Sequence, residues 1–385
     1  MKTSNVRAPI NVNNGTIFVA LELSRRTWLV TMYSPDRDRN SRYKVAGGDH
    51  AALLALIERI RARAARALGF TPAVVSCYEA GYDGFWLHRV LIAAGITNYV
   101  FDPASIAVEQ RGRRAKTDRI DNEQLLRTLM SHCRGEPRAV RIVRVPSRDQ
   151  EDARRATREE DRLTSEQGAH INRMKALLRL LGIAVGNPRR SDWLTWIAQQ
   201  RDPQGEAVPP YMLAELEREH ARLMLVREQL AALKKPSAQM KLTPAAAEMA
   251  RRRDQLFDLK SLGPAFSSKL TNEAFYKDFK NRREVGGYFG LGGSPWRSGD
   301  TDHEQGISKA GNRRARHAAV ELAWLWLQHQ PDSALSRWYK QRTLDASKRV
   351  RRIMIVALAR KLMVALWRYL TTGLVPAGAV LRPSV

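Results

Sequence analysis

The chain has 385 residues, 44% of them hydrophobic, which is enough for two or three domains with apolar cores and excludes a disordered basic tail. Its 65 lysines and arginines against 39 aspartates and glutamates give a formal net charge of +26, which indicates a polyanionic partner. Nucleic acid fits this charge better than a membrane surface, because the positive charge runs along the whole chain and no single basic amphipathic helix dominates.

Two cysteines, Cys77 and Cys133, are too few for a disulfide framework or a paired-cysteine zinc motif. Residues 1–14 lack the apolar core of a secretion signal, and three cations interrupt the most apolar stretch, 353–370. We therefore expect a cytoplasmic, nucleoid-associated protein with no membrane partner.

Short β-rich runs and helical patterns alternate between residues 15 and 131. Three strands come first, and strands and helices then take turns, which is the order of a ribonuclease-H-like mixed sheet. The expected strands are 16–23, 28–33, 42–45, 73–78 and 98–101, and the expected helices are 50–68, 85–94 and 118–130.

The composition then becomes charged and helix-favouring. Residues 148–181 and 210–234 carry apolar side chains at helical spacing, which predicts a hairpin of two helices that acts as a dimerising or domain-spacing coiled coil. Beyond a Pro-containing linker lies a compact helical region rich in aromatic residues and arginine. We expect an α/β domain at 1–146, a helical coiled-coil spacer at 147–243 and a helical C-terminal domain at 244–385.

Four acids of the first domain have the positions that a metal site requires. Glu22 and Glu79 each end an apolar strand, and Asp118 and Asp121 share one face of a predicted helix start. Carboxylate oxygens are the ligands that Mg²⁺ or Mn²⁺ prefers, and two such ions assist phosphoryl transfer. Taken singly, each acid also has an ordinary explanation: helix capping for the aspartates, a turn for Glu79 and a strand-edge ion pair for Glu22.

A resemblance to a known family is carried by two blocks of motifs. The first consists of Val-Ala-Leu-Glu-Leu-Ser around Glu22, Tyr-Glu-Ala-Gly around Glu79 and Lys-Thr-Asp-Arg-Ile-Asp ending at Asp121. The second consists of Leu-Gly-Pro, Asp-Phe-Lys, Tyr-Phe-Gly-Leu, Arg-Ser-Gly-Asp and Glu-Gln-Gly-Ile-Ser-Lys-Ala-Gly-Asn-Arg-Arg-Ala-Arg, between residues 262 and 316. Together they resemble the insertion sequence 110 family of transposases, which includes the Piv-type DNA invertases.

The resemblance implies a RuvC-like domain whose four acids bind the metal, and a nucleophilic serine in the C-terminal domain, matched by Ser298. It also implies a homo-oligomer, a dimer or tetramer, that acts on donor and target DNA under the direction of a structured guide (bridge) RNA. The family usually has aspartate where this chain has Glu22, and glutamate also ligates Mg²⁺. From the sequence alone Ser298 is a turn hydroxyl with three neighbouring rivals, Ser294, Thr301 and Ser308.

Two basic clusters are candidates for phosphate contacts. The first lies before the paired aspartates and is otherwise a solvated loop; the second is expected to open a helix. The candidates are Arg111, Arg113, Arg114 and Lys116 in the first cluster, and Lys309, Asn312, Arg313, Arg314 and Arg316 in the second. Trp296, Tyr288 and Phe289 are possible base-stacking residues, but we expect Tyr288 and Phe289 to be core residues.

The combined interpretation is a DNA transposase-recombinase that cuts and rejoins DNA by metal-assisted serine attack. The alternatives are a site-specific DNA invertase, a junction nuclease that hydrolyses with metal alone, and a catalytically dead nucleic-acid-binding protein.

Overall fold

The computed structural model describes residues 15–106, 118–136, 139–233, 243–298 and 301–383. The chain divides into two compact units, 1–145 and 146–385. The first boundary lies one residue from the expected one, and the second unit contains both the helical hairpin and the C-terminal helices. Among the residues that the structure describes, no helix combines the length and the apolarity that a membrane crossing needs.

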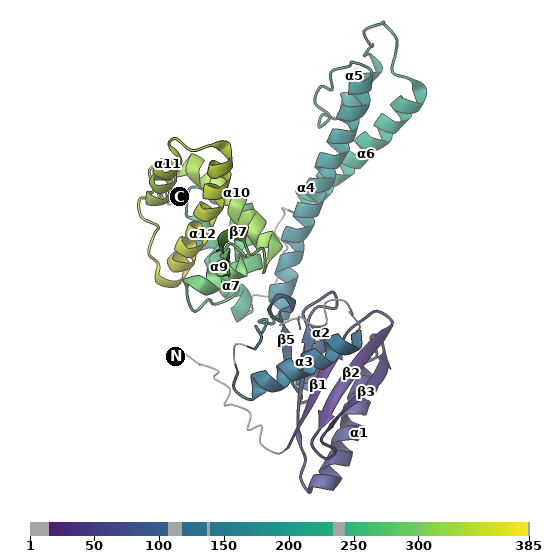
Figure 1. The fold of residues 1–385 in the computed structure, drawn as a ribbon. Helices are drawn as coiled ribbons and strands as arrows, with labels where there is room; N and C mark the ends of the chain where they lie inside the picture. Colours follow the sequence, from purple (N-terminus) through teal and green to yellow (C-terminus); the bar gives the residue numbers. More distant parts are fainter. Residues whose placement is uncertain (1–14, 107–117, 137–138, 234–242, 299–300, 384–385) are drawn as a thin grey trace. The chain divides into compact units, whose positions relative to one another are not determined.

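A five-stranded mixed sheet forms the centre of the first unit (Figure 1). The strand order is β3-β2-β1-β4-β5; β1 is antiparallel to β2 and parallel to β4, and β4 is parallel to β5. The elements are β1 (Thr16–Glu22), β2 (Thr27–Ser34), β3 (Arg39–Ala46), α1 (His50–Leu68), β4 (Ala73–Glu79), α2 (Trp86–Ala93), β5 (Thr97–Phe101), η1 (Pro103–Ser105) and α3 (Asp118–Cys133).

Helices cover both faces of this sheet, because successive side chains of a buried strand point to opposite faces. Ile17, Val19 and Leu21 of β1 pack against α1 and α2. Phe18 and Ala20, the residues between them, pack with leucines of α3 on the other face. The mixed α/β character, the strand order along the chain and the helix at residues 50–68 are therefore as expected.

The second unit begins with the helical hairpin of α4 (Arg148–Leu180) and α6 (Pro210–Leu233), with the short α5 (Trp193–Ala198) between them. Ser147 starts α4 with a capping box. The Ser147 side chain accepts a hydrogen bond from the backbone N–H of Gln150, and the Gln150 side chain accepts one from the backbone N–H of Ser147. An apolar seam and cross-helix ion pairs such as Arg173–Glu215, at 2.6 Å, join the two long helices. The expected hairpin is thus present.

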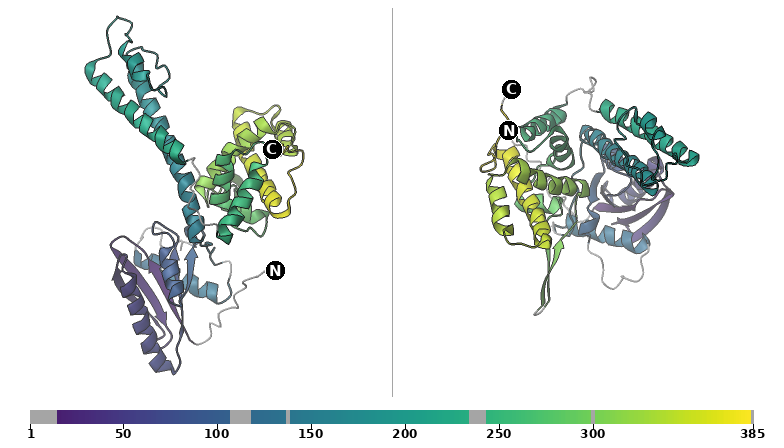
Figure 2. Two further views of the ribbon diagram at one scale, coloured as in Figure 1. Left: turned by 180° about the vertical axis from the view of Figure 1, so that it is seen from behind. Right: turned by 90° about the horizontal axis from the view of Figure 1, so that it is seen from above.

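The C-terminal helices pack around α10 and α12, whose buried aliphatic residues form the largest core of the chain. The elements are α7 (Pro244–Phe257), α8 (Pro264–Leu270), the π-helical turn η3 (Thr271–Phe275), α9 (Arg282–Tyr288), β6 (Gly293–Ser298), β7 (Thr301–Ile307), α10 (Arg313–His329), α11 (Ala334–Thr343) and α12 (Lys348–Thr372). Strands β6 and β7 pair as a hairpin that extends away from these helices (Figure 2). The expectation of a wholly helical C-terminal domain is therefore wrong for these residues.

Candidate functional site

Two carboxylates end neighbouring strands on one face of the sheet. Glu22 is the last residue of β1 and Glu79 the last of β4, one step beyond the paired residues Leu21 and Tyr78. Alternate residues of a strand share one face, and the residues two positions before each carboxylate, Ala20 and Cys77, pack with leucines of α3. Glu22 is half-buried and Glu79 is exposed. The structure therefore brings Glu22 and Glu79 to the same edge and the same face of the sheet.

The start of α3 is fastened beside these strand ends by a buried amide. Asn122 is 1% exposed, and its Nδ2 donates to the backbone oxygen of Leu29 and to Oγ1 of Thr31, each at 3.0 Å. Leu29 of β2 pairs directly with Glu22. Asn122 thus attaches the turn that carries Asp121 next to the strand that carries Glu22.

The aspartates themselves are described only in part. Asp118 is the first residue of α3, and its side chain lies outside the described residues; Asp121 is exposed at the same helix start. Where side chains are described, no three His, Cys, Asp or Glu residues form a group that could hold a metal ion. The basic cluster before α3 also lies outside the described residues, which applies to Arg111, Arg113, Arg114 and Lys116.

Two buried or partly buried thiols lie beneath the carboxylates, and burial makes them less reactive. Cys77 is fully buried, and its burial, followed by the nearby Cys133 and Glu79, raises the pKa of its thiol. Burial also raises the pKa of Cys133 to about 11. Both sulfurs are therefore protonated at neutral pH and are poor nucleophiles.

Ser298 is the last residue of β6 and pairs with Thr301, the first residue of β7. The side chains of Ser298, Thr301 and Trp296 lie outside the described residues. Of the two rivals with described side chains, Ser294 also lies on β6, and the exposed Ser308 follows β7. Phe289 is fully buried and Tyr288 packs on the same core, which confirms the expectation that these two rings are core residues.

The second basic cluster is divided between a loop and a helix. The helix α10 begins at Arg313, whereas Lys309 has a positive φ of 55° and lies before it, so the expectation that Lys309 opens the helix is wrong. Gly311 has φ of 91°, and a Cβ there would meet the backbone oxygen of Tyr288 at 2.3 Å. Only glycine fits this approach, which sets the direction in which the chain enters α10.

The polar atoms of the Asn312 side chain are hydrogen-bonded within the protein. Its Oδ1 accepts from the backbone of Arg314 and Ala315 and caps α10, while its Nδ2 donates at 3.0 Å to both the backbone oxygen and the carboxylate of Glu273. Asn312 therefore has a structural role here, and a contact with nucleic acid remains a prediction.

Glu273 is a buried carboxylate that joins three elements. Its side chain is 1% exposed, and Arg158 of α4 donates to it through Nε at 2.6 Å and Nη2 at 3.1 Å. Burial raises its pKa, but hydrogen bonds from Arg158 and Asn312 and the charges of Arg158 and Arg154 outweigh this and hold the pKa below the usual range. The network connects α4, the turn η3 and the start of α10.

The remaining arginines of the cluster differ in exposure and in the bonds that their side chains make within the protein. Arg313 is exposed, and Arg316 Nη1 donates to the backbone of Lys309 at 2.9 Å. Arg314 lies 3.7 Å from Asp161 of α4, with the guanidinium about half exposed. Of these three arginines, Arg313 is the best placed to meet an external phosphate.

Asn122 and Glu273 were not among the residues predicted from the sequence. Asn122 lies one helical turn before Leu125 and Leu126 on the apolar stripe of α3, and a polar residue on such a stripe signals a buried hydrogen bond. Glu273 has no comparable signal, because its partner Arg158 is 115 positions away.

Comparison with known proteins gives a consistent result. The model of the family described as "Transposase IS116/IS110/IS902 family" matches residues 253–340. The Sinorhizobium fredii protein named "Putative transposase y4rJ" is 44% identical over 382 residues, 97% of this chain and 96% of its own length. Another protein of that organism, "Putative transposase y4qE", is 26% identical over 86% of this chain and 77% of its own length. The transposase for insertion sequence element IS1328 of Yersinia enterocolitica is 24% identical over 90% of this chain and 98% of its own length. The chain therefore belongs to the IS110/IS116/IS902 family of insertion-sequence transposases.

Proposed function

We propose that this transposase cuts and rejoins DNA by attack of the Ser298 hydroxyl on a phosphodiester, assisted by Mg²⁺ or Mn²⁺ bound in a RuvC-like domain. The observation that carries the proposal is the shared sheet face of Glu22 and Glu79, beside the helix start that Asn122 fastens. The strand order is 3-2-1-4-5, with antiparallel pairing from β3 to β1 and parallel pairing from β1 to β5, and this order supports a ribonuclease-H-like architecture.

The proposed metal ligands are Glu22, Glu79, Asp118 and Asp121. Three elements contribute them, and acids at two adjacent strand ends fit a hard divalent cation, which prefers oxygen ligands. When bound, such a cation polarises the phosphate and stabilises the attacking and leaving oxygens. The protein residues hold the cation and keep the carboxylates on one face of the sheet.

In the proposed chemical step, the Ser298 hydroxyl loses its proton as its oxygen forms a bond to phosphorus. The bond from phosphorus to one deoxyribose oxygen breaks, and that oxygen takes up a proton. The phosphoserine ester keeps the energy of the broken bond, so that a free DNA hydroxyl can reverse the step and rejoin the strand. Ser298 ends β6, a strand of the hairpin that extends away from the C-terminal helices (Figure 2), and this place supports access of DNA to the residue.

The family resemblance further suggests a structured guide RNA and a homo-oligomer, with the segments 1–146, 147–243 and 244–385 as metal-binding, spacing and serine-bearing parts. The net charge of +26 is compatible with both DNA and RNA. The long hairpin of α4 and α6 supplies a surface of the kind that joins subunits.

Strand cleavage by Asp121→Asn and Asp118→Asn in the presence of Mg²⁺ tests the proposal. Asparagine keeps the shape of the side chain and removes its charge, so we expect cleavage to be lost while DNA binding persists. Glu123→Gln is the matched control, because Glu123 lies on the same helix but pairs with Arg42. Cleavage near the parent rate by either aspartate variant would overturn the metal site.

A further inference from the structure

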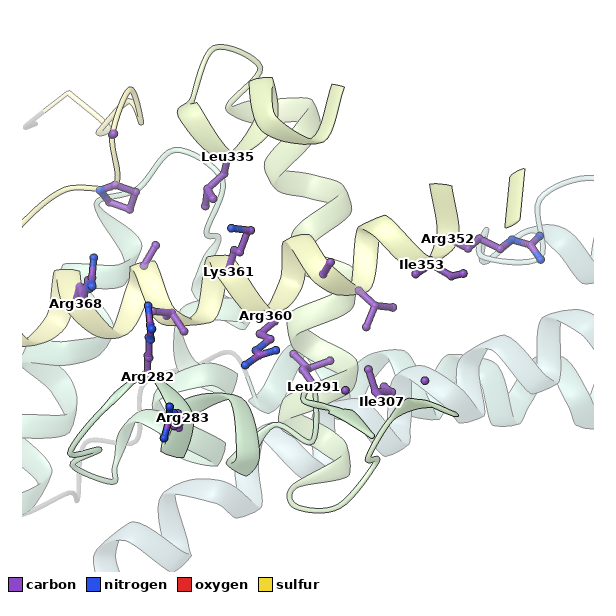
Figure 3. A pocket seen from close by; sticks show the side chains of 18 of the residues that line it. Arg282, Arg283, Leu291, Ile307, Leu335, Arg352, Ile353, Arg360, Lys361 and Arg368 are labelled. Carbon is purple, nitrogen blue, oxygen red and sulfur yellow. The ribbon is translucent and has the colours of Figure 1, made fainter. Parts of the chain in front are cut away.

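An open cavity of about 1510 Å³ runs along α12 in the second unit (Figure 3). It is bordered by α9, by the ends of the β6–β7 hairpin that lie nearest the helices, and by the segment that follows α12. We call it the α12 groove. Its floor is aliphatic and includes Ile353 and Leu374, which are 57% and 68% exposed. Large apolar side chains left in water indicate a surface that a ligand covers.

The described side chains that line the α12 groove carry charge of one sign. None of them is acidic, and the seven cationic residues among them are Arg282, Arg283, Arg349, Arg352, Arg360, Lys361 and Arg368. Arg282 of α9 and Arg360 of α12 lie in the space between the two helices (Figure 3). Within the described part of the chain none of the seven forms an ion pair, whereas Arg158, Arg173 and Arg251 of the same unit do. Cations that converge without counter-charges repel one another, and a polyanion relieves that repulsion.

The length of the cationic row indicates what kind of anion fits. Arg349 and Arg368 are 19 residues apart on one helix, or about 28 Å at 1.5 Å per residue. At 3.4 Å per phosphate, one strand of a duplex would present about eight phosphates over that length. No aromatic residue is among the described side chains that line the groove, so these offer bases no ring on which to stack. The chemistry therefore favours contact with the backbone, with aliphatic side chains against the sugars.

We propose that the α12 groove binds the sugar-phosphate backbone of a nucleic-acid strand, as a site additional to the contacts expected at the start of α10. The inference rests on the proposed function only in taking nucleic acid as the ligand; it requires neither the metal nor Ser298. An acidic amphipathic peptide is the competing ligand, and a row of cations spread over about 28 Å fits a regular array of phosphates better.

The test measures binding of the full-length chain to a fluorescent 30-base-pair DNA duplex and to an RNA hairpin of similar length, in EDTA. Arg352, Arg360 and Arg368 are exposed and evenly spaced along the groove. Replacing all three by alanine should make the slope of log affinity against log salt shallower by about two to three units for the ligand that occupies the groove. A shallower slope with the duplex alone would identify DNA as the ligand of the groove, and a shallower slope with the hairpin alone would identify RNA.

The matched control removes the same charge from α11, by replacing Arg337, Lys340 and Arg342 with alanine; all three are exposed and lie outside the groove. We expect its slope to fall by less than one unit. Lysine at the three groove positions should restore the parent slope, which separates charge from folding. Unchanged binding of both nucleic acids by the groove variant, or an equal fall in the control, would overturn the proposal. Because no cleavage is measured, failure of the proposed chemistry would leave this result intact.

Discussion

The Glu273→Gln substitution should loosen the junction between α4 and the C-terminal helices. Glutamine keeps the shape of the side chain but loses the charge that receives two hydrogen bonds from Arg158 and one from Asn312. Breaking a buried ion pair costs about 3–5 kcal/mol when the remaining charge is also buried. Arg158 is 44% exposed and water can solvate it in part, so we expect a loss of about 2–3 kcal/mol.

Thermal unfolding of the full chain by scanning calorimetry measures this loss. For a unit of this size, 1 kcal/mol corresponds to about 2–4 °C, so the transition of the second unit should fall by about 4–12 °C. The pKa of Glu273 is lower in the folded state than its ordinary value of 4.5. The stability that ionised Glu273 contributes is therefore fully present above pH 4.5 and is lost as the pH falls through the pKa of the folded state. The melting temperatures of parent and variant should therefore converge in acid.

Glu248→Gln is the control for Glu273. Glu248 also pairs with two arginines, Arg251 and Arg252, and hydrogen bonds led by that of Arg251 lower its pKa to about 2. It is 42% exposed, so its removal should cost no more than about 1 kcal/mol. Hydrogen exchange should increase around η3 and the start of α10 only in the Glu273 variant. A melting temperature within 1 °C of the parent, with unchanged exchange there, would refute the reasoning.

Three further predictions concern nucleic-acid processing. Asn122→Ala should raise the Mg²⁺ concentration needed for half-maximal cleavage about tenfold, because the start of α3 is no longer fastened to β2. Thr31→Val should have a smaller effect, because the hydrogen bond from Asn122 to Leu29 remains. If Asn122→Ala and the parent showed the same dependence on Mg²⁺, Asn122 would have no part in the site. Glu22→Asp should cleave more slowly than the parent and Glu22→Ala not at all, and full activity of the alanine variant would make Glu22 an ordinary strand residue. Arg313→Ala should make the salt slope of DNA binding shallower by about one unit, and Arg314→Ala by less because Asp161 shares its charge; the opposite ranking would contradict the assignment.

The elements with strong local patterns could be predicted from the sequence. The Ala-rich helix at 50–68 matches α1 at both ends, and the apolar runs before Glu22 and Glu79 placed these acids at the ends of β1 and β4. Their common sheet face follows from the register between β1 and β4, which sequence spacing does not determine.

Features that depend on distant partners were not predicted. The β6–β7 hairpin was missed because its strands carry glycine, proline and charged residues in place of a β-branched alternation. The bonds of Asn122 to β2 and of Arg158 to η3 span 91 to 115 positions. The α12 groove could not be predicted, because apolar and cationic residues are distributed around the whole of this long helix and the sequence does not show which face other elements leave uncovered.

The most direct test of the central claim is to look for DNA attached covalently to Ser298. A nicked duplex incubated with the full chain and Mg²⁺, followed by denaturation and peptide mapping by mass spectrometry, should give an adduct on Ser298. Ser298→Ala should bind DNA normally and give neither adduct nor strand exchange. An adduct on Ser294, Thr301 or Ser308 would contradict the residue assignment, and cleavage without any adduct would contradict serine attack in favour of hydrolysis by metal alone.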